Sequence, residues 1–226
     1  MGRARIDPVK HRDPERAQTL GEEIANSISH GLGLLVAIAS IPFLILTALP
    51  HGDAAMVVGA AVFGVSMVLL YASSMFYHAL PSRARKAKRL FQLFDHASIY
   101  LLIAGSYTPF TLGVLRGSLG WTLFGIVWGL AVFGVLMKCL GWMWHPWLST
   151  GLYLLMGWLV MVAIVPLVRG LPTPGLVLLV AGGLAYTAGV IFYVADHKPY
   201  AHFIWHLFVV AGTACHIGAV LVMQNS

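Results

Sequence analysis

Two histidines stand four residues apart in the segment HFIWH, where His202 and His206 open the last apolar run of the chain. Residues at positions i and i+4 share one face of an α-helix and lie about 6 Å apart. Both imidazoles could therefore bind one metal ion, although two unrelated histidines at a helix end would show the same spacing. A metal site requires further ligands from elsewhere in the chain.

His78 is the third candidate ligand, at the end of an earlier apolar run. Three neutral imidazoles suit zinc, and three protein ligands that leave one position open are typical of catalytic zinc sites. His216 follows His206 by ten residues. That spacing is about 15 Å along a helix, which is too far for the same ion. The sequence thus predicts a zinc (Zn2+) site formed by His78, His202 and His206.

Two polar residues near these ligands are candidates for catalysis. Asp95 could hydrogen-bond a metal-bound water or act as a general base. Ser74 precedes His78 by one helical turn and could orient a ligand or polarise a carbonyl group. Two less specific interpretations stay open, in which Asp95 pairs with Arg89 and Ser74 hydrogen-bonds its own backbone.

A supporting polar stripe is expected beside the ligands. Glu23, Asn26 and His30 have the spacing i, i+3, i+7 at the start of the first apolar run, and Tyr71 precedes His78 by seven residues. Ionisable groups inside membrane helices are costly and usually functional. Alternatively, the first two are first-turn residues favoured by the helix dipole, and His30 is a hydrogen bonder at a helix contact.

The elements that carry these residues are apolar segments of membrane-spanning length. The 226 residues are 59% hydrophobic and 10% charged, whereas soluble domains contain about 25% charged residues. Seven apolar runs of about 20 residues can each span a bilayer. Their composition does not alternate with the period of barrel strands, so helices are expected. The runs are 24–49, 55–79, 94–115, 119–140, 147–168, 174–195 and 201–223.

The predicted fold is an all-α membrane protein, a seven-transmembrane helix bundle over residues 23–226 preceded by a short basic cytoplasmic arm over residues 1–22. In this topology, twelve of the fourteen Lys and Arg residues fall on the same side of the membrane as the N-terminus. This bias predicts a cytoplasmic N-terminus and an outside C-terminus. The candidate site residues then share one depth, at the cytoplasmic ends of their helices.

Membrane lipids are the expected partners of this chain. The basic segment 83–89 is expected to face anionic headgroups, and nucleic acid is not an expected partner. A basic chain whose first residues are too polar for a signal peptide suits a bacterial inner membrane. The sequence does not indicate an oligomeric state.

Four segments carry a family resemblance: EEIANSISHG, SSMFYH, LFDHASIYLLIAGSYTPF and HFIWHLFVV. From about residue 20 onward the chain resembles the hemolysin III branch of the progestin and adipoQ receptor family, which includes the adiponectin receptors. This resemblance implies a seven-helix bundle with an inside N-terminus. It also implies that His78 of the SxxxH motif and His202 and His206 of the HxxxH motif bind zinc, and that Asp95 orients the zinc-bound water.

Three functions are compatible with these features. The first is a zinc-dependent intramembrane hydrolase, and family analogy suggests a ceramide-like lipid amide at the cytoplasmic leaflet as its substrate. The second is a non-enzymatic protein, stabilised by zinc, that regulates membrane lipid state or signalling. The third is a pore-forming cytolysin. A pore needs polar lining through the whole membrane, whereas the ionisable residues here gather at one end of the predicted helices.

Overall fold

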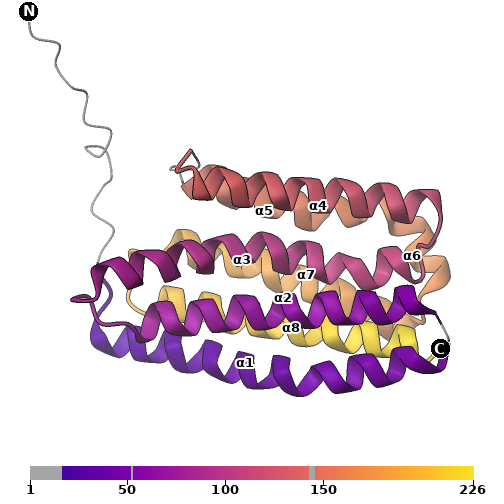
Figure 1. The fold of residues 1–226 in the computed structure, drawn as a ribbon, viewed down its shortest axis with the longest axis horizontal. Helices are drawn as coiled ribbons and strands as arrows, with labels where there is room; N and C mark the ends of the chain where they lie inside the picture. Colours follow the sequence, from indigo (N-terminus) through magenta and orange to yellow (C-terminus); the bar gives the residue numbers. More distant parts are fainter. Residues whose placement is uncertain (1–16, 52, 143–145) are drawn as a thin grey trace, which may run out of the picture.

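The computed structural model describes residues 17–51, 53–142 and 146–226, and every regular element in these ranges is helical. The helices run side by side along one long axis (Figure 1). In chain order they are α1 (Leu20–Ala48), the 3-10 turn η1 (Leu49–His51), α2 (Ala54–Ala79), α3 (Arg85–Leu112), α4 (Ser118–Cys139), α5 (Pro146–Trp158), the 3-10 turn η2 (Leu159–Ala163), α6 (Ile164–Gly170), α7 (Thr173–Val194) and α8 (Ala201–Gln224).

Six segments are long and apolar enough to cross a membrane: α1, α2, α4, the combined segment Trp147–Gly170, α7 and α8. Large apolar side chains cover their outer faces, as Phe43 in α1 and Phe133 in α4 illustrate, since both are exposed. Water would not favour such a surface, but lipid does. The prediction of an all-helical integral membrane protein is therefore confirmed at this level.

The seventh helix, α3, is not among these six segments, so the seven-span count stays a prediction. It begins at Arg85, nine residues before the predicted start, because the basic residues of segment 83–89 continue the helix beyond its apolar part. It packs against α2, α4, α5 and α8, and many of its small and polar side chains are buried. Protein rather than lipid surrounds most of α3, which explains its low apolar content.

The predicted run 147–168 is not one continuous helix, because it breaks at η2 between α5 and α6. Pro166 contributes to the break, since it has no N–H to donate to the carbonyl of Val162. The Tyr107 hydroxyl of α3 lies at this break. It is 2.8 Å from the Met156 carbonyl and 2.7 Å from the Gly157 carbonyl, and it accepts the Val160 N–H at 2.8 Å. One side chain thus satisfies backbone groups that the break leaves unpaired.

Small residues let the central helices approach one another. A Cβ built on Gly134 of α4 would lie 2.5 Å from the Tyr100 ring of α3, which is 0% exposed. A Cβ on Gly105 of α3 would lie 2.1 Å from the Ser66 hydroxyl of α2. These positions are occupied by glycine because the neighbouring helix fills the space, as is common between membrane helices.

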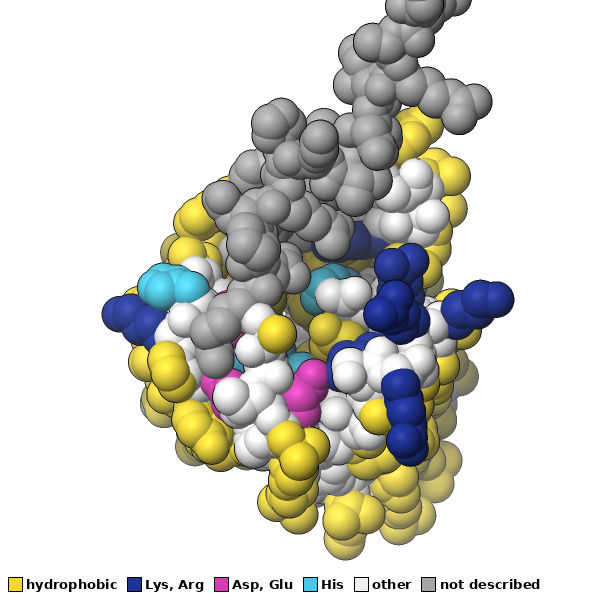
Figure 2. Space-filling model, turned by 90° about the vertical axis from the view of Figure 1, so that its left-hand side faces the viewer, with side chains coloured by type: hydrophobic (Ala, Val, Ile, Leu, Met, Phe, Trp, Pro, Cys, Tyr) yellow, Lys and Arg dark blue, Asp and Glu magenta, His cyan; other side chains and the backbone are white. Residues whose placement is uncertain are grey.

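Charge is distributed unevenly between the two ends of the bundle. One end carries the start of α1, the connection between α2 and α3 and the start of α8 (Figure 1). The space-filling view of that end shows most of the Lys and Arg on one side, further basic and His side chains at the opposite edge, and Asp and Glu nearer the middle (Figure 2). At the opposite end, Arg116 pairs with the N-cap residue of α2, Asp53. Residues 1–16 of the predicted arm lie outside the described residues, and the inside orientation of this end stays a prediction.

Candidate metal centre

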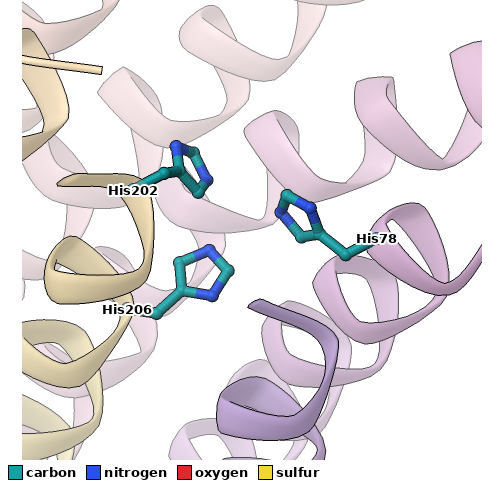
Figure 3. Close-up of side chains that lie close together, drawn as sticks. All are labelled: His78, His202 and His206. Carbon is teal, nitrogen blue, oxygen red and sulfur yellow. The ribbon is translucent and has the colours of Figure 1, made fainter. Parts of the chain in front are cut away.

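The three candidate ligands lie together at this polar end of the bundle. His78 stands in the last turn of α2, while His202 and His206 occupy the first two turns of α8. One nitrogen from each imidazole lies within 4.8 Å of the other two. Their ring centroids are 4.7 to 5.2 Å apart, and the rings face a common space (Figure 3). His78 precedes His202 by 124 residues and His206 by 128 residues. The structure therefore brings together ligands that are far apart in the sequence.

Glu23 of α1 orients the first ligand. The Oε2 atom of Glu23 lies 2.7 Å from Nδ1 of His78. A carboxylate only accepts, so Nδ1 carries the proton and Nε2 keeps its lone pair. Lys88 of α3 donates to the other carboxylate oxygen at 2.6 Å and to the Leu80 carbonyl at 3.1 Å. The carboxylate thereby joins α1, α2 and α3 behind His78.

A different part of α1 orients His206. Its Nδ1 lies 3.2 Å from the Asn26 carbonyl oxygen and 3.2 Å from the Ser29 hydroxyl. The Ser29 hydroxyl donates its own proton to the Asn26 carbonyl at 2.9 Å, so Nδ1 of His206 is the donor to both oxygens. The lone pair is again left on Nε2. His30 stacks on the same ring, with centroids 3.5 Å apart and planes 9° apart.

His202 is held more loosely than the other two ligands. Its Nδ1 lies 3.4 Å from Oδ1 of Asp196 and has no hydrogen-bond partner of good geometry. The start of its helix is nevertheless fixed. Tyr200 adopts a left-handed backbone with φ of 58°, and its N–H donates to Oε1 of Glu22 in α1 at 2.7 Å. Glu22 also closes a capping box with Thr19 at the start of α1, so the first turns of α1 and α8 are tied together.

The arrangement fits zinc by an observation independent of the motif. Nε2 of His78 is buried without a hydrogen-bond partner, although an uncompensated buried acceptor is costly. The Nε2 of His206 is likewise left free by the tautomer that its neighbours impose. Imidazole ligands backed by a carboxylate and a carbonyl are typical of zinc sites. The described cysteines, Cys139 and Cys215, do not belong to the cluster.

Asp95 lies near two of the three histidines, and Ser74 lies beside Asp95. Asp95 is 7% exposed and is close enough to His78, His202 and Ser74 for electrostatic interaction with each. Its alternative ion pair with Arg89 is not formed in the described part of the chain. The Ser74 hydroxyl is fully buried without a hydrogen-bond partner of good geometry, whereas the neighbouring Ser73 bonds backbone carbonyls. Asp95 lines a cavity in the bundle, whereas Ser74 is fully buried beside it.

The expected polar stripe surrounds the ligands. The Tyr71 ring meets the edge of the His30 ring at 5.1 Å, and its hydroxyl donates to Thr213 at 2.8 Å. Asn26 acts on His206 through its carbonyl, while its side chain donates to Gln18 at 2.6 Å. Glu23 is a first-turn residue of α1, as the alternative interpretation holds, and it also contacts a candidate ligand.

Three supporting residues were not predicted from the sequence: Ser29, Lys88 and Asp196. Ser29 adjoins His30, so the helical period of the stripe offered a signal for it. Lys88 falls in the basic segment 83–89, which was expected to face headgroups, and Asp196 lies between two of the predicted apolar runs. Their contacts with Glu23 and His202 depend on how the helices pack.

A largely apolar cavity of about 230 Å³ opens from the candidate centre into the bundle. Asp95, His202 and His206 line one part of it. Leu123 of α4 and Leu176 of α7, which stand in the halves of their helices away from the polar end, line another part. The cavity therefore extends from the polar end far along the helices.

Comparison with known proteins places the chain among relatives of one family. A model of the family described as haemolysin-III related matches residues 18–217, a range that contains all the candidate site residues. The chain is 47% identical over 204 residues to "Hemolysin-3" of Bacillus cereus, which covers 90% of this chain and 92% of that protein. It is 46% identical over 203 residues to "Hemolysin-3 homolog" of Bacillus subtilis, with coverage of 90% and 94%.

A human protein shows a weaker similarity. The chain is 29% identical over 226 aligned residues to "Monocyte to macrophage differentiation factor", covering 94% of this chain and 90% of that protein. The similarity thus extends over nearly the whole length of both bacterial and mammalian relatives.

Proposed function

The chain belongs to the haemolysin-III-related family, and we propose that it is a zinc-dependent intramembrane hydrolase of a lipid amide. In this proposal seven helices span the membrane with the N-terminus inside. The candidate centre then lies at the cytoplasmic leaflet. The proposed location is a bacterial inner membrane, and the bacterial relatives support a bacterial membrane.

The observation that carries the proposal is the combination of an open three-histidine cluster with a buried carboxyl group beside it. Zinc, when held by His78, His202 and His206, supplies Lewis acidity toward a carbonyl oxygen and activates water near neutral pH. A purely structural zinc site is usually closed by four protein ligands. Asp95 is buried close to two of the histidines rather than paired with a cation.

Residues of the chain would carry out proton transfer, stabilise the developing charge and orient the ligands. Asp95 accepts a proton from the attacking water, whose oxygen bonds to the amide carbon. The carbon–nitrogen bond then breaks, and Asp95 returns the proton to the leaving amine. The Ser74 hydroxyl keeps its proton and donates a hydrogen bond to the carbonyl oxygen, where negative charge develops. Glu23 and the α1 residues behind His206 hold the imidazoles in the required tautomer and orientation.

A lipid substrate suits the surroundings of the centre. The cavity offers apolar walls to a long chain, and the polar end places the reacting group near the headgroup region. The basic segment 83–89 would face anionic headgroups at the same polar end of the bundle. The identity of the amide as ceramide-like rests on the family resemblance.

A second candidate is a non-enzymatic zinc site that stabilises a regulator of membrane lipid state or signalling. Glu23 favours it, because this residue connects α1, α2 and α3 around one ligand and a bound ion would reinforce that junction. A cytolytic pore is less well supported. The walls of the cavity are mostly apolar away from the histidine cluster, whereas a pore requires polar lining along its whole length.

Metal analysis combined with a hydrolysis assay tests the proposal. Purified wild-type protein is expected to contain about one zinc per chain and to cleave a lipid amide in a screen of ceramide-like substrates. His202→Ala should remove the metal, because two imidazoles remain. Asp95→Asn should keep the metal and lose about 100-fold or more in turnover. Zinc retention with no turnover in the wild type against any lipid amide would favour the structural alternative.

A further inference from the structure

A second polar group lines the cavity, far from the three histidines. His216 stands in α8 ten residues beyond His206, which places it about 15 Å further along the helix axis. It is 8% exposed, and its side chain contributes to the wall of the same cavity. The proposed hydrolysis does not use this residue.

The hydrogen bond of His216 determines which of its two nitrogens carries the proton. Nδ1 lies 2.9 Å from the Gly212 carbonyl oxygen. A carbonyl only accepts, so Nδ1 carries the proton and Nε2 is the acceptor. Nε2 is bonded to no described residue, and the His216 side chain lines the cavity. His216 therefore offers one lone pair to whatever fills this part of the cavity.

The surrounding residues make a fitted place for this ring. A Cβ on Gly182 of α7 would lie 2.5 Å from Nδ1 of His216, so only glycine leaves room for the imidazole. The ring of Tyr186 lies beside it, with centroids 5.4 Å apart. A Cβ on Gly212 would in turn lie 2.8 Å from the Tyr186 ring. Two glycines thus accommodate two polar aromatic rings in the middle of an apolar bundle.

The neighbouring hydroxyl groups are already committed to one another. Thr213 donates its proton to the Val209 carbonyl at 2.9 Å, so it can only accept from tyrosine. Tyr71 and Tyr186 each lie 2.8 Å from the Thr213 oxygen and donate to it. The protons of these three groups are therefore used within the protein. Nε2 of His216 is left as an acceptor that needs a donor from a ligand.

We propose that His216 recognises a hydroxyl group carried on the apolar chain of the bound lipid. A hydroxyl is a donor that such a chain can carry without charge, and an unmet acceptor in apolar surroundings is costly. The inference rests on the proposed function for where the head of the lipid lies, since the chain must extend from the histidine cluster to His216. It makes His216 a determinant of specificity for hydroxylated chains.

Competition binding tests the proposal with probes that are not hydrolysed. Zinc-loaded wild-type protein in detergent is titrated with stearic acid and with a positional series of hydroxystearic acids, each displacing a fluorescent fatty acid. One mid-chain isomer is expected to bind about threefold to tenfold more tightly than stearic acid, the range of one hydrogen bond. His216→Phe should bind stearic acid at least as tightly as wild type and lose the preference.

Two further variants keep the outcome decisive. Tyr186→Phe removes a hydroxyl that is committed to Thr213, so it should keep the preference. His216→Gln retains an acceptor oxygen and should keep part of the preference for the hydroxylated chain. This variant replaces the phenylalanine variant in the test if the latter does not fold. Absence of any preference in wild type would mean that water alone occupies the subsite, and a preference that survives in His216→Phe would also overturn the proposal. In Asp95→Asn protein the preference should persist, so failure of the hydrolase proposal is distinguishable from failure of this one.

Discussion

Oε2 of Glu23 lies 2.7 Å from Nδ1 of His78, so a helix that supplies none of the candidate metal ligands determines the orientation of one of them. The same helix contacts His206 through Asn26 and Ser29. Two of the three imidazoles in the candidate centre therefore depend on α1. Outer contacts of this kind commonly contribute to metal affinity and to the basicity of the ligand.

Replacing Glu23 by glutamine should weaken zinc binding by about 10-fold to 100-fold, the usual effect of removing a partner behind a metal-bound histidine. The amide is nearly isosteric but loses the charge that holds the proton on Nδ1 of His78. Competition with a zinc-chelating dye measures the affinity. Asp53→Asn is the matched control, because it removes a carboxylate at the opposite end of the bundle and should leave zinc affinity unchanged. Equal affinities for the two variants would show that Glu23 does not support the centre.

His30→Ala should lower zinc affinity by about tenfold, because the stacked ring no longer fixes the plane of His206. His30→Phe should restore most of the loss, since a phenyl ring can stack in the same space. The same dye competition compares the two variants. If the phenylalanine variant binds zinc as weakly as the alanine variant, the nitrogens of His30 rather than its stacking support the centre.

Gly134→Ala should destabilise the bundle by about 1–3 kcal/mol, the usual cost of overpacking a filled core. The added methyl group would meet the buried Tyr100 ring at 2.5 Å. Gly129, on the same helix, has nothing within 4 Å of its built Cβ, so Gly129→Ala should change the stability little. Thermal unfolding in detergent measures the difference. Comparable losses in both variants would show that the effect comes from α4 itself and not from its contact with α3.

The predicted orientation can be tested with single cysteines in a background without Cys139 and Cys215. Ser82, between α2 and α3, and Ser118, at the start of α4, are both exposed at opposite ends of the bundle. A membrane-impermeant maleimide should label Ser118→Cys on intact cells and Ser82→Cys only after permeabilisation. The opposite labelling pattern would place the N-terminus outside.

The sequence predicted most of the apolar helices closely, because each must satisfy its whole backbone in lipid with about 20 apolar residues. The predicted run 55–79 corresponds to the helix Ala54–Ala79, and the run 201–223 corresponds to the helix Ala201–Gln224. The start of α3 was wrong by nine residues, since helix formation by basic residues leaves no mark in an apolar pattern. The break at η2 was also missed, because the hydroxyl of Tyr107 that satisfies it comes from another helix.

In the candidate site, too, local sequence patterns predicted some features, while contacts between helices determine the others. The helical period and the shared depth of the polar residues were enough to group His78, His202 and His206, and the structure places their nitrogens together. Their tautomers could not be predicted, since these depend on contacts of α1 with α2 and α8. The link from Lys88 to Glu23 likewise joins residues 65 positions apart, which no local pattern signals.

The central position of α3 has a consequence for how the chain enters its membrane. A segment whose polar residues suit protein surroundings gains little by partitioning into lipid alone. If α3 spans the membrane as predicted, we expect it to enter the bilayer together with neighbours that cover it, and α2 and α4 flank it in both sequence and space. Asp95 is carried by this helix, so on that prediction its burial would depend on the packing of the partner helices.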